Sequence, residues 1–295
     1  MRIKHTMMIF AGGALALSVQ GALAQQFNGG LPLGWTCAGN CGASGADGVV
    51  TLPPNLLSTQ YGWVSTSQGV TGVSPFSPPT SGTGGVGNTN GSTLTSNAFL
   101  ASVGDTLNFY FNYVTSDGGT YADYGWSRLL NAADSSQAAL LFTARTEPVG
   151  SIIPGQDLPA PNATLTPASV PIFNAGYNWN TDTGPQWTPL GAGGNGKCWF
   201  DGCGYTGWVL ASYTIATAGS YRLEFGVTNW DDELWDSGMA FDGATIAGVA
   251  IDDDSKRDPE YEDNKSPVPE PETYAMLLAG LGLLGFTARR RKKSA

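Results

Sequence analysis

The chain has 295 residues, of which 41% are hydrophobic and 13% are charged, and its formal net charge is −10. This share of apolar and aromatic residues excludes a disordered chain, and the 41 glycines follow no Gly-X-Y period that would indicate collagen. The single histidine, His5, lies in an N-terminal segment that we expect to be removed, so the rest of the chain cannot use Ser-His-Asp or Cys-His catalysis or histidine-ligated metals.

The N-terminus has the composition of a secretory signal peptide. Two basic residues are followed by the uncharged, mostly apolar run 7–19, and then by Ala22 and Ala24, the small residues that signal peptidase requires before its cleavage site. We therefore predict that residues 1–24 form a signal helix, which signal peptidase removes after Ala24. The alternative interpretation is a buried first helix of the folded domain.

Residues 25–251 are predicted to form one all-β domain. The clearest strand is Asp105–Val114, in which apolar residues such as Phe109 and Phe111 alternate with polar ones, and Ser220–Thr228 repeats this period of two. Further candidate strands are Asp47–Leu52, Ala138–Thr143, Thr206–Ile215 and Met239–Ile251. Because no stretch of the body sustains a helical period, we predict a single β-sandwich or jelly-roll-like domain, interrupted by long loops at 69–95 and 149–188.

Four cysteines lie in the part that would be exported: Cys37, Cys41, Cys198 and Cys203. Disulfides persist in exported proteins, and four cysteines allow three pairings. Glycine-containing turns between the close pairs favour the local disulfides Cys37–Cys41 and Cys198–Cys203. A four-cysteine zinc site is the alternative, although the spacing of the cysteines is irregular.

Tryptophans are dense in the second half of the domain, and Trp179, Trp187 and Trp199 lie in predicted loops. Exposed aromatic rings can stack on the apolar faces of sugar rings, while amide and acidic side chains such as that of Asp201 bind the hydroxyls. We therefore interpret these four residues as candidate ligand-binding residues for extracellular polysaccharide. The alternative is packing in the core, which we favour for the strand-like positions Trp208 and Trp230.

The densest carboxylate cluster of the domain comprises Asp231, Asp232, Glu233, Asp236 and Asp242. Ca²⁺ prefers oxygen ligands, so the four aspartates of this cluster are candidate ligands of a structural Ca²⁺ ion, which is the one cofactor that the sequence suggests. No EF-hand spacing is present. The alternative interpretation is a solvated turn that resists aggregation.

Any catalysis in this domain would depend on carboxylates. Glu224, paired with Asp123 or Asp236, is a candidate for a glycoside hydrolase or lyase, and a glycosidase needs two carboxylates about 5–10 Å apart. No spacing in the sequence supports either pair. We therefore assign no catalytic residue and expect a protein that is not an enzyme.

Beyond the domain, residues 252–267 are dominated by Asp and Glu and predict an acidic, disordered linker. Val268, Pro269, Glu270 and Pro271 follow, then the apolar run Tyr274–Ala288, and then the basic stop Arg289, Arg290, Arg291, Lys292 and Lys293. The apolar run would span about 22 Å as a helix, which is short of a ~30 Å hydrocarbon core. We expect a short transmembrane helix, with its basic end in the cytoplasm, that anchors the protein transiently in the inner membrane. A permanent tail anchor is the alternative.

This order of motif, short apolar helix and basic cluster at 268–295 resembles the PEP-CTERM sorting signal of Gram-negative bacteria. The resemblance implies that an exosortase, a membrane-embedded transpeptidase-like cysteine protease, recognises Pro269-Glu270-Pro271, and that cleavage and delivery to the cell surface or the exopolysaccharide matrix follow. The segments Phe109–Leu130 and Asn229–Ile246 look like the β-sandwich ectodomains that often precede such tails.

Together these features predict an exported surface or matrix protein that contacts polysaccharide without catalysis. A carboxylate-based glycoside hydrolase or lyase and a purely structural matrix protein are the alternatives. Loss of the basic residues at both ends would leave the exported part more acidic than the whole chain. Such a surface repels nucleic acid, so we expect no nucleic-acid partner.

Overall fold

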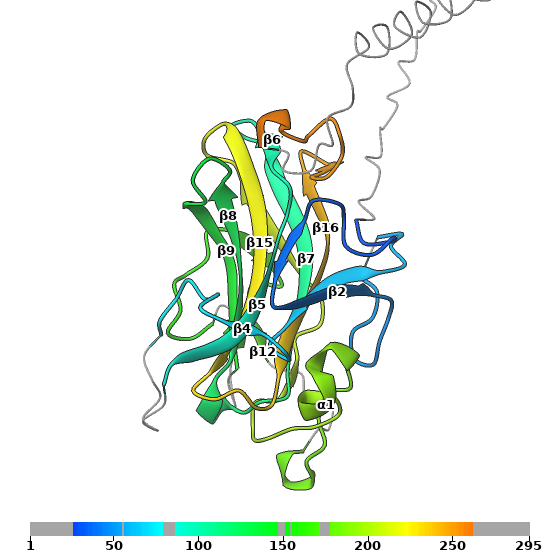
Figure 1. Cartoon of the computed structure of the whole chain (residues 1–295), viewed down its shortest axis with the longest axis vertical. Coiled ribbons are helices and arrows are strands. Elements are labelled where there is room, and N and C mark those ends of the chain that lie inside the picture. The colour runs from blue at the N-terminus through cyan, green and yellow to red at the C-terminus, as the bar shows by residue number, and fades with distance from the viewer. Residues whose placement is uncertain are drawn as a thin grey trace, which may run out of the picture.

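Two antiparallel sheets pack face to face in the computed structural model (Figure 1), which describes residues 26–54, 56–78, 86–146, 151–153, 155–171 and 178–261. The predicted signal peptide, sorting motif, transmembrane helix and basic stop lie outside these residues. Within the described part of the chain, no helix is long and apolar enough to cross a membrane. The predicted all-β sandwich is confirmed.

The first sheet has seven strands. Its order is β1 (Thr36–Ala38), β5 (Asn88–Thr95), β15 (Gly219–Trp230), β8 (Tyr124–Asn131) and β9 (Gln137–Arg145), with β4 (Val70–Thr71) paired to β5 and β6 (Phe99–Ala101) paired to β15. The predicted strands 138–143 and 220–228 are the centres of β9 and β15.

The second sheet has eight strands. Its order is β11 (Thr164–Thr166), β14 (Val209–Thr214), β7 (Thr106–Thr115), β16 (Ser237–Ile246), β3 (Tyr61–Ser65) and β2 (Asn40–Ser44), with β13 (Gly204–Tyr205) on β7 and β17 (Val249–Ala250) on β16. A separate pair joins β10 (Ser151–Ile153) to β12 (Val170–Pro171). The described helices are single turns: η1 (Gly119–Tyr121), η2 (Trp179–Thr181), η3 (Thr188–Leu190), α1 (Gly191–Gly194) and η4 (Pro259–Tyr261).

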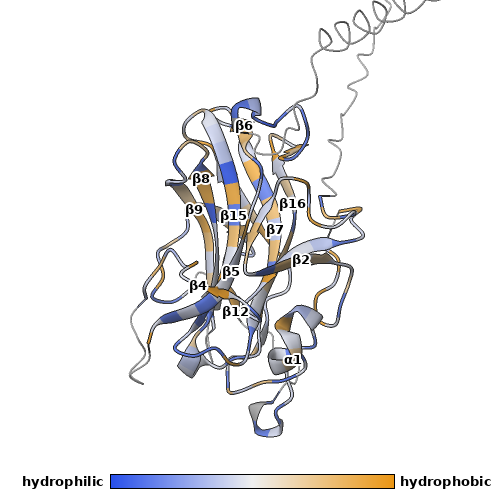
Figure 2. Cartoon of the chain, viewed as in Figure 1, coloured by the Kyte–Doolittle hydropathy of each residue, from blue (hydrophilic) through white to orange (hydrophobic). Residues whose placement is uncertain are grey.

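The core is formed by the alternating apolar residues of both sheets. Phe109 of β7 contacts Phe225 of β15 edge to face with ring centroids 5.2 Å apart, and Phe111 of β7 stacks on Phe142 of β9 at 3.6 Å. All four rings are buried, and Figure 2 shows the apolar bands that run along these strands. The period of two in the sequence therefore identifies the buried face of each strand.

Two expectations about local structure are wrong. Asp47–Leu52 is not a strand; its one ladder contact is a bridge between Asp47 and Val50. Conversely, the segment expected as a loop at 69–95 contains the eight-residue strand β5, which pairs with β1 on one side and β15 on the other. β5 is polar, and Gly91 lets its backbone approach β15 so closely that a Cβ there would lie 2.2 Å from the carbonyl oxygen of Val227. Backbone pairing on both sides holds this strand, although its side chains show no apolar period.

The boundary of the acidic linker also differs from the prediction. Residues 252–261 return to the sandwich and lie beside β6 (orange in Figure 1). The Leu100 amide donates to the Lys256 carbonyl at 2.7 Å, and the Asp258 amide donates to the Ala98 carbonyl at 3.1 Å. These bonds hold a segment whose composition alone indicates disorder, because they use the backbone and not the side chains. Residues 262–267 lie outside the described part.

The local disulfides are confirmed. Cys37 is bonded to Cys41 and Cys198 to Cys203, and no described cysteine is free. All four sulfurs are therefore used, which rules out the four-cysteine zinc site.

Candidate functional site

Aromatic side chains of two loops line one pocket close to α1, the short helix that lies at one end of the sandwich in Figure 1. We name Trp199, Phe200 and Trp235 the aromatic platform. The indole rings of Trp199 and Trp235 stack with centroids 5.5 Å apart at 29°. Trp199 is 45% exposed and Phe200 38%. These exposed fractions are unusual for large aromatic residues, which a soluble domain normally places in its core.

The platform lines an open pocket of about 560 Å³ together with Asn180, Asp182 and Cys198. Asn180 and Asp182 are exposed and belong to the short hairpin 178–183, which is closed by the bridge between Asn178 and Thr183. The pocket thus combines flat apolar faces with one amide and one carboxylate at its edge. Such a combination suits a ligand that has both apolar faces and hydroxyl groups.

Two structural devices hold the platform in place. The Cys198–Cys203 disulfide closes the loop that carries Trp199 and Phe200, and both of its cysteines are buried. The Trp199 amide donates to the carbonyl of Ser116 at 2.9 Å. Phe200 packs directly against Gly118: a Cβ on Gly118 would lie 2.3 Å from the Cβ of Phe200. Only a glycine at position 118 leaves room for Phe200.

The loop between β15 and β16 brings Trp235 to the same place. Trp235 adopts a left-handed backbone with φ of 57°, which a non-glycine residue takes up only where its surroundings hold it. Hydrogen bonds to the next residue, Asp236, fix this backbone conformation. The Ser116 hydroxyl donates to the Asp236 carbonyl at 2.8 Å, and the Thr66 hydroxyl donates to the Asp236 carboxylate at 3.0 Å.

Two fully buried carboxylates, Asp117 and Asp123, lie behind the platform. Asp123 accepts hydrogen bonds from the Trp230 amide at 2.8 Å and the Ser237 hydroxyl at 2.6 Å. One oxygen of Asp117 accepts from the Gly118 amide at 2.7 Å, and the other has no hydrogen-bond partner. Burial raises the pKa of both carboxyls, and the charge of Asp123 raises that of Asp117 further. Burial therefore favours the protonated form of these acids in the folded protein.

The structure separates the predicted ligand-binding residues. Trp199 belongs to the platform, and Asp201 is exposed in the same disulfide loop but does not line the pocket. The expectation for Trp187 is wrong: it is fully buried, and its indole nitrogen donates to the Tyr61 hydroxyl at 3.0 Å. The backbone of Trp179 begins η2, and its side chain lies outside the described part.

Trp235 is a partner of Trp199 that the sequence does not predict. Its presence in the dense group of tryptophans was the available signal. Nothing in the spacing of that group places two particular rings together, because the contact depends on two separate loops.

The four aspartates expected to bind one Ca²⁺ do not form one site. Asp231 accepts from the Gly87 amide, Asp232 from the Leu234 amide and Asp236 from the Thr66 hydroxyl. Asp242 lies six residues beyond Asp236 along β16, which is about 20 Å. Among the described residues, no group of three or more acidic, cysteine or histidine side chains is placed to hold a metal.

The candidate catalytic pairs are also separated. Glu224 is held by Arg128 at 2.6 Å, and one of its oxygens accepts from the Trp126 indole at 3.1 Å. Asp123 lies beside Trp230, six residues farther along β15, so about 20 Å separates it from Glu224. A glycosidase requires about 5–10 Å between its carboxylates, so neither Asp123 nor Asp236, which lies beyond Trp230, can act with Glu224.

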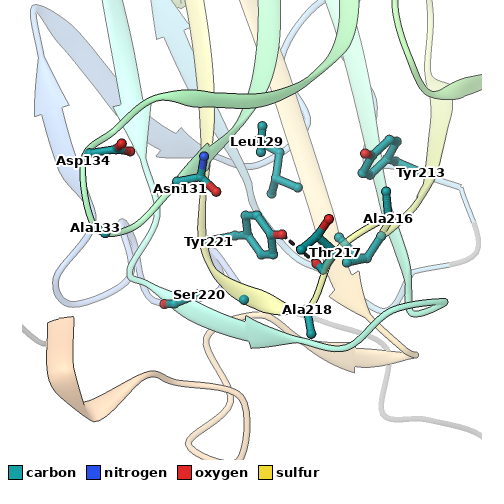
Figure 3. Close-up of a pocket in the computed structure, with 13 residues that line it drawn as sticks. Leu129, Asn131, Ala133, Asp134, Tyr213, Ala216, Thr217, Ala218, Ser220 and Tyr221 are labelled. Atoms are coloured by element: carbon teal, nitrogen blue, oxygen red, sulfur yellow. Dashed lines mark hydrogen bonds between the residues drawn. The ribbon is translucent and has the colours of Figure 1, made fainter.

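A second pocket, of about 530 Å³, lies at the opposite end of the sandwich, between the β8–β9 and β14–β15 turns (Figure 3). Its aromatic members are Tyr213 and Tyr221, and the Tyr221 hydroxyl donates to the Thr217 carbonyl at 2.6 Å. The one carboxylate that lines it, Asp134, already accepts from the amide and hydroxyl of Ser136. This pocket presents no stacked exposed rings and is a weaker candidate than the platform.

Comparison with known proteins adds one specific finding. Residues 267–292 match the family model of the PEP-CTERM protein-sorting motif. The chain therefore carries this motif at its C-terminus, as the resemblance predicted. The motif implies export, processing by an exosortase, and sorting through the membrane to the cell surface.

The matches outside the motif are distant. The chain is similar to the K1 cleaved adhesin domain of Lys-gingipain from Porphyromonas gingivalis W83, with 10% identity, a TM-score of 0.33 and coverage of 75% of this chain and 94% of that chain. It is also similar to the enzymatically active domain of tailspike protein 4 of bacteriophage CBA120, with 12% identity, a TM-score of 0.28 and coverage of 78% and 21%. No curated protein matches the chain. Both structural likenesses are too distant to indicate a function.

Proposed function

We propose that this surface protein, sorted by its PEP-CTERM motif, binds polysaccharide without catalysis through the aromatic platform. One observation carries the proposal: Trp199 and Trp235 stack at one end of the sandwich and line a pocket that also holds an exposed amide and carboxylate. Because the sorting motif directs the protein to a sugar-rich cell surface, polysaccharide is the ligand class that such a pocket would meet there.

The chemistry of the platform suits a pyranose ring. The flat indole faces offer apolar contact to the C–H face of the sugar. The Asn180 amide can donate and accept hydrogen bonds, while the Asp182 carboxylate accepts them from sugar hydroxyls. Asp182 is the one carboxylate among the residues that line the pocket, whereas glycoside hydrolysis by the usual route requires two. This lining supports binding over cleavage.

The charge around the platform selects among polysaccharides. Asp182 and Asp201 are exposed in the two loops of the site, and the acidic run 231–233 directly precedes Leu234 and Trp235. These carboxylates repel a polyanionic chain. We therefore expect the platform to bind neutral polysaccharides better than those rich in uronic acid or sulfate.

A polysaccharide array tests this proposal with the full-length chain, purified in a mild detergent. We expect Trp199→Ala and Trp235→Ala each to weaken binding to neutral glycans at least about tenfold, since truncating a central aromatic contact commonly has such an effect. The matched control is Leu234→Ala, which removes a 63% exposed apolar side chain next to Trp235 but outside the pocket lining. The control should bind like the unmodified protein.

Three outcomes contradict the proposal. Absence of binding to any glycan, including the exopolysaccharide of the host, supports a purely structural matrix protein. Release of oligosaccharide from a bound polymer makes the protein an enzyme. Binding that survives both tryptophan substitutions places the contact elsewhere on the surface.

The route to the surface is tested separately. Replacing Pro269, Glu270 and Pro271 by alanine should leave uncleaved precursor in the inner membrane, because the exosortase loses its recognition motif. Ser266→Ala, one residue before the matched segment, is the control and should be sorted normally. Normal arrival of the triple variant at the surface contradicts transient anchoring through this motif.

A further inference from the structure

A buried carboxylate without a partner lies in the middle of β16, far from the platform. Asp242 is 1% exposed, and neither of its carboxylate oxygens accepts a hydrogen bond of ordinary geometry. No salt bridge between described residues reaches it. An isolated charge in such a place is strongly unfavourable unless a counter-ion or a proton neutralises it.

A β-bulge in β16 turns the Asp242 side chain toward the buried interior. The ladder between β16 and β7 is irregular between Asp242 and Thr245, and Gly243 takes a left-handed φ of 71°. A β-bulge of this kind re-aims the neighbouring side chain. Leu56 packs where a Cβ on Gly243 would stand, at 2.6 Å, so the bulge is built into the packing of the domain.

Three other segments bring polar side chains to this part of β16, and the Ile251 amide, which donates to the Ala244 carbonyl at 3.2 Å, brings the adjoining Asp252 beside it. Asp252, half-buried after β17, lies close enough for its charge to raise the pKa of Asp242, although burial is the larger cause of that rise. The buried Ser58 hydroxyl and the Gly243 amide face Asp242 and act to lower its pKa as weak hydrogen-bond donors, although the Ser58 contact falls short of ordinary hydrogen-bond geometry. Gln26 completes the group: its amide nitrogen donates to Asp252 at 3.3 Å, and its amide oxygen accepts from the Ala244 backbone at 2.9 Å.

Arg257, the basic side chain that acts on Asp252, does not neutralise this group. Arg257 donates through Nε to the backbone carbonyl of Asp252 at 3.1 Å and pairs with the exposed Asp254 at 3.6 Å. It lowers the pKa of Asp252 only as a lesser influence than burial, which raises it. Two carboxylates and a buried hydroxyl thus lie close together, and no described salt bridge to a basic side chain reaches either carboxylate.

We propose that Asp242 and Asp252 bind a divalent cation, with the Ser58 hydroxyl as a neutral oxygen donor and Gln26 holding Asp252 in place. The donor set contains only oxygen, which favours the hard cations Ca²⁺ and Mg²⁺ over zinc or copper. Ca²⁺ fits better because it accepts carboxylate and hydroxyl oxygens at irregular geometry, whereas Mg²⁺ demands an octahedron and retains water. Two carboxylates place the expected affinity for Ca²⁺ near that of extracellular modules, about 10⁻⁴–10⁻³ M.

This cation would join both ends of the exported domain. Gln26 is the first residue that the structure describes, and Asp252 begins the segment that leads along β6 toward the sorting motif. Binding would therefore fix the tail on the sandwich in a Ca²⁺-rich exterior. The site is independent of the aromatic platform, so failure of either proposal leaves the other standing.

Thermal unfolding of the full-length chain in detergent, followed by tryptophan fluorescence, tests the site. With 10 mM CaCl₂ in place of EGTA, the midpoint should rise by about 3–10 °C, and 10 mM MgCl₂ should raise it less. Asp242→Asn and Asp252→Asn should lose this rise, while Asp254→Asn, whose side chain is 96% exposed, should keep it. In EGTA the Asp242→Asn variant should still unfold in a single cooperative transition, which shows that it folds.

Limited proteolysis gives a local measurement. Ca²⁺ should slow tryptic cleavage after Arg257 at least about fivefold in the unmodified protein and not in Asp252→Asn. An unmodified protein that shows no Ca²⁺ effect overturns the proposal, as does a Ca²⁺ effect that survives in Asp242→Asn. Loss of the effect in Asp117→Asn with its retention in Asp242→Asn would assign the cation to the acids behind the platform instead, and would equally refute the site.

Discussion

The buried acids behind the platform predict an unusual dependence of stability on pH. Burial raises the folded-state pKa of Asp117 and Asp123 above the ordinary value of about 3.9. Above that value the unfolded chain releases protons that the folded chain retains, so the free energy of unfolding falls as pH rises. The loss begins near pH 4 and continues until the folded-state pKa is reached.

The magnitude follows from the number of protons retained. Each buried acid that stays protonated lowers the free energy of unfolding by about 1.4 kcal/mol per pH unit. Asp117→Asn removes one such group, so its stability relative to the unmodified protein should increase by about 4 kcal/mol between pH 5 and pH 8. The new amide nitrogen occupies a position where one oxygen of Asp117 had no hydrogen-bond partner, which costs about 1–3 kcal/mol at every pH. That cost displaces the whole curve without changing its slope.

Urea unfolding of the full-length chain at pH 5, 6, 7 and 8 measures this difference, with EGTA present so that only protons compete for the carboxylates. Tryptophan fluorescence reports on the folded domain, because all nine tryptophans lie between Trp35 and Trp235. The exposed control Asp201→Asn should stay within about 0.5 kcal/mol of the unmodified protein at each pH. A pH-independent difference between Asp117→Asn and the unmodified protein would show that Asp117 is ionised in the fold and would refute the reasoning.

Two further changes separate the support of the platform from the core. Replacing Cys198 and Cys203 together by alanine should lower the free energy of unfolding in urea by about 2 kcal/mol, because the unfolded chain loses a cross-link with a sequence separation of 5. The same variant should bind polysaccharide more weakly on the array. Unchanged binding would show that the disulfide does not position Trp199. Trp187→Phe removes the indole donor of the buried Tyr61 hydroxyl and should cost about 1–3 kcal/mol in the same urea assay, while folded protein keeps its affinity for glycans. A loss of affinity in this variant would argue that Trp187 contributes to the site.

Features that depend on a few consecutive residues were predictable from the sequence. Alternation of apolar and polar residues identified the strands that became β7 and β15 and the face that each buries. The close pairs Cys37–Cys41 and Cys198–Cys203 could bond locally because turns bring neighbouring residues together without help from the rest of the fold. The sorting motif is likewise a contiguous pattern, and its identification needs no tertiary structure.

Burial and clustering were decided by segments far apart in the chain. Trp187 and Trp199 lie in the same stretch of loop, yet Tyr61 of β3 encloses the first ring, and the loop before β16 brings Trp235 against the second. Asp242 was grouped with Asp231–Asp236 by proximity in sequence, but an extended strand carries it about 20 Å away and a docked tail brings Asp252 to it. Sequence spacing cannot predict such neighbours, because the pairing of strands and the packing of loops determine which side chains share low-dielectric space and which face water.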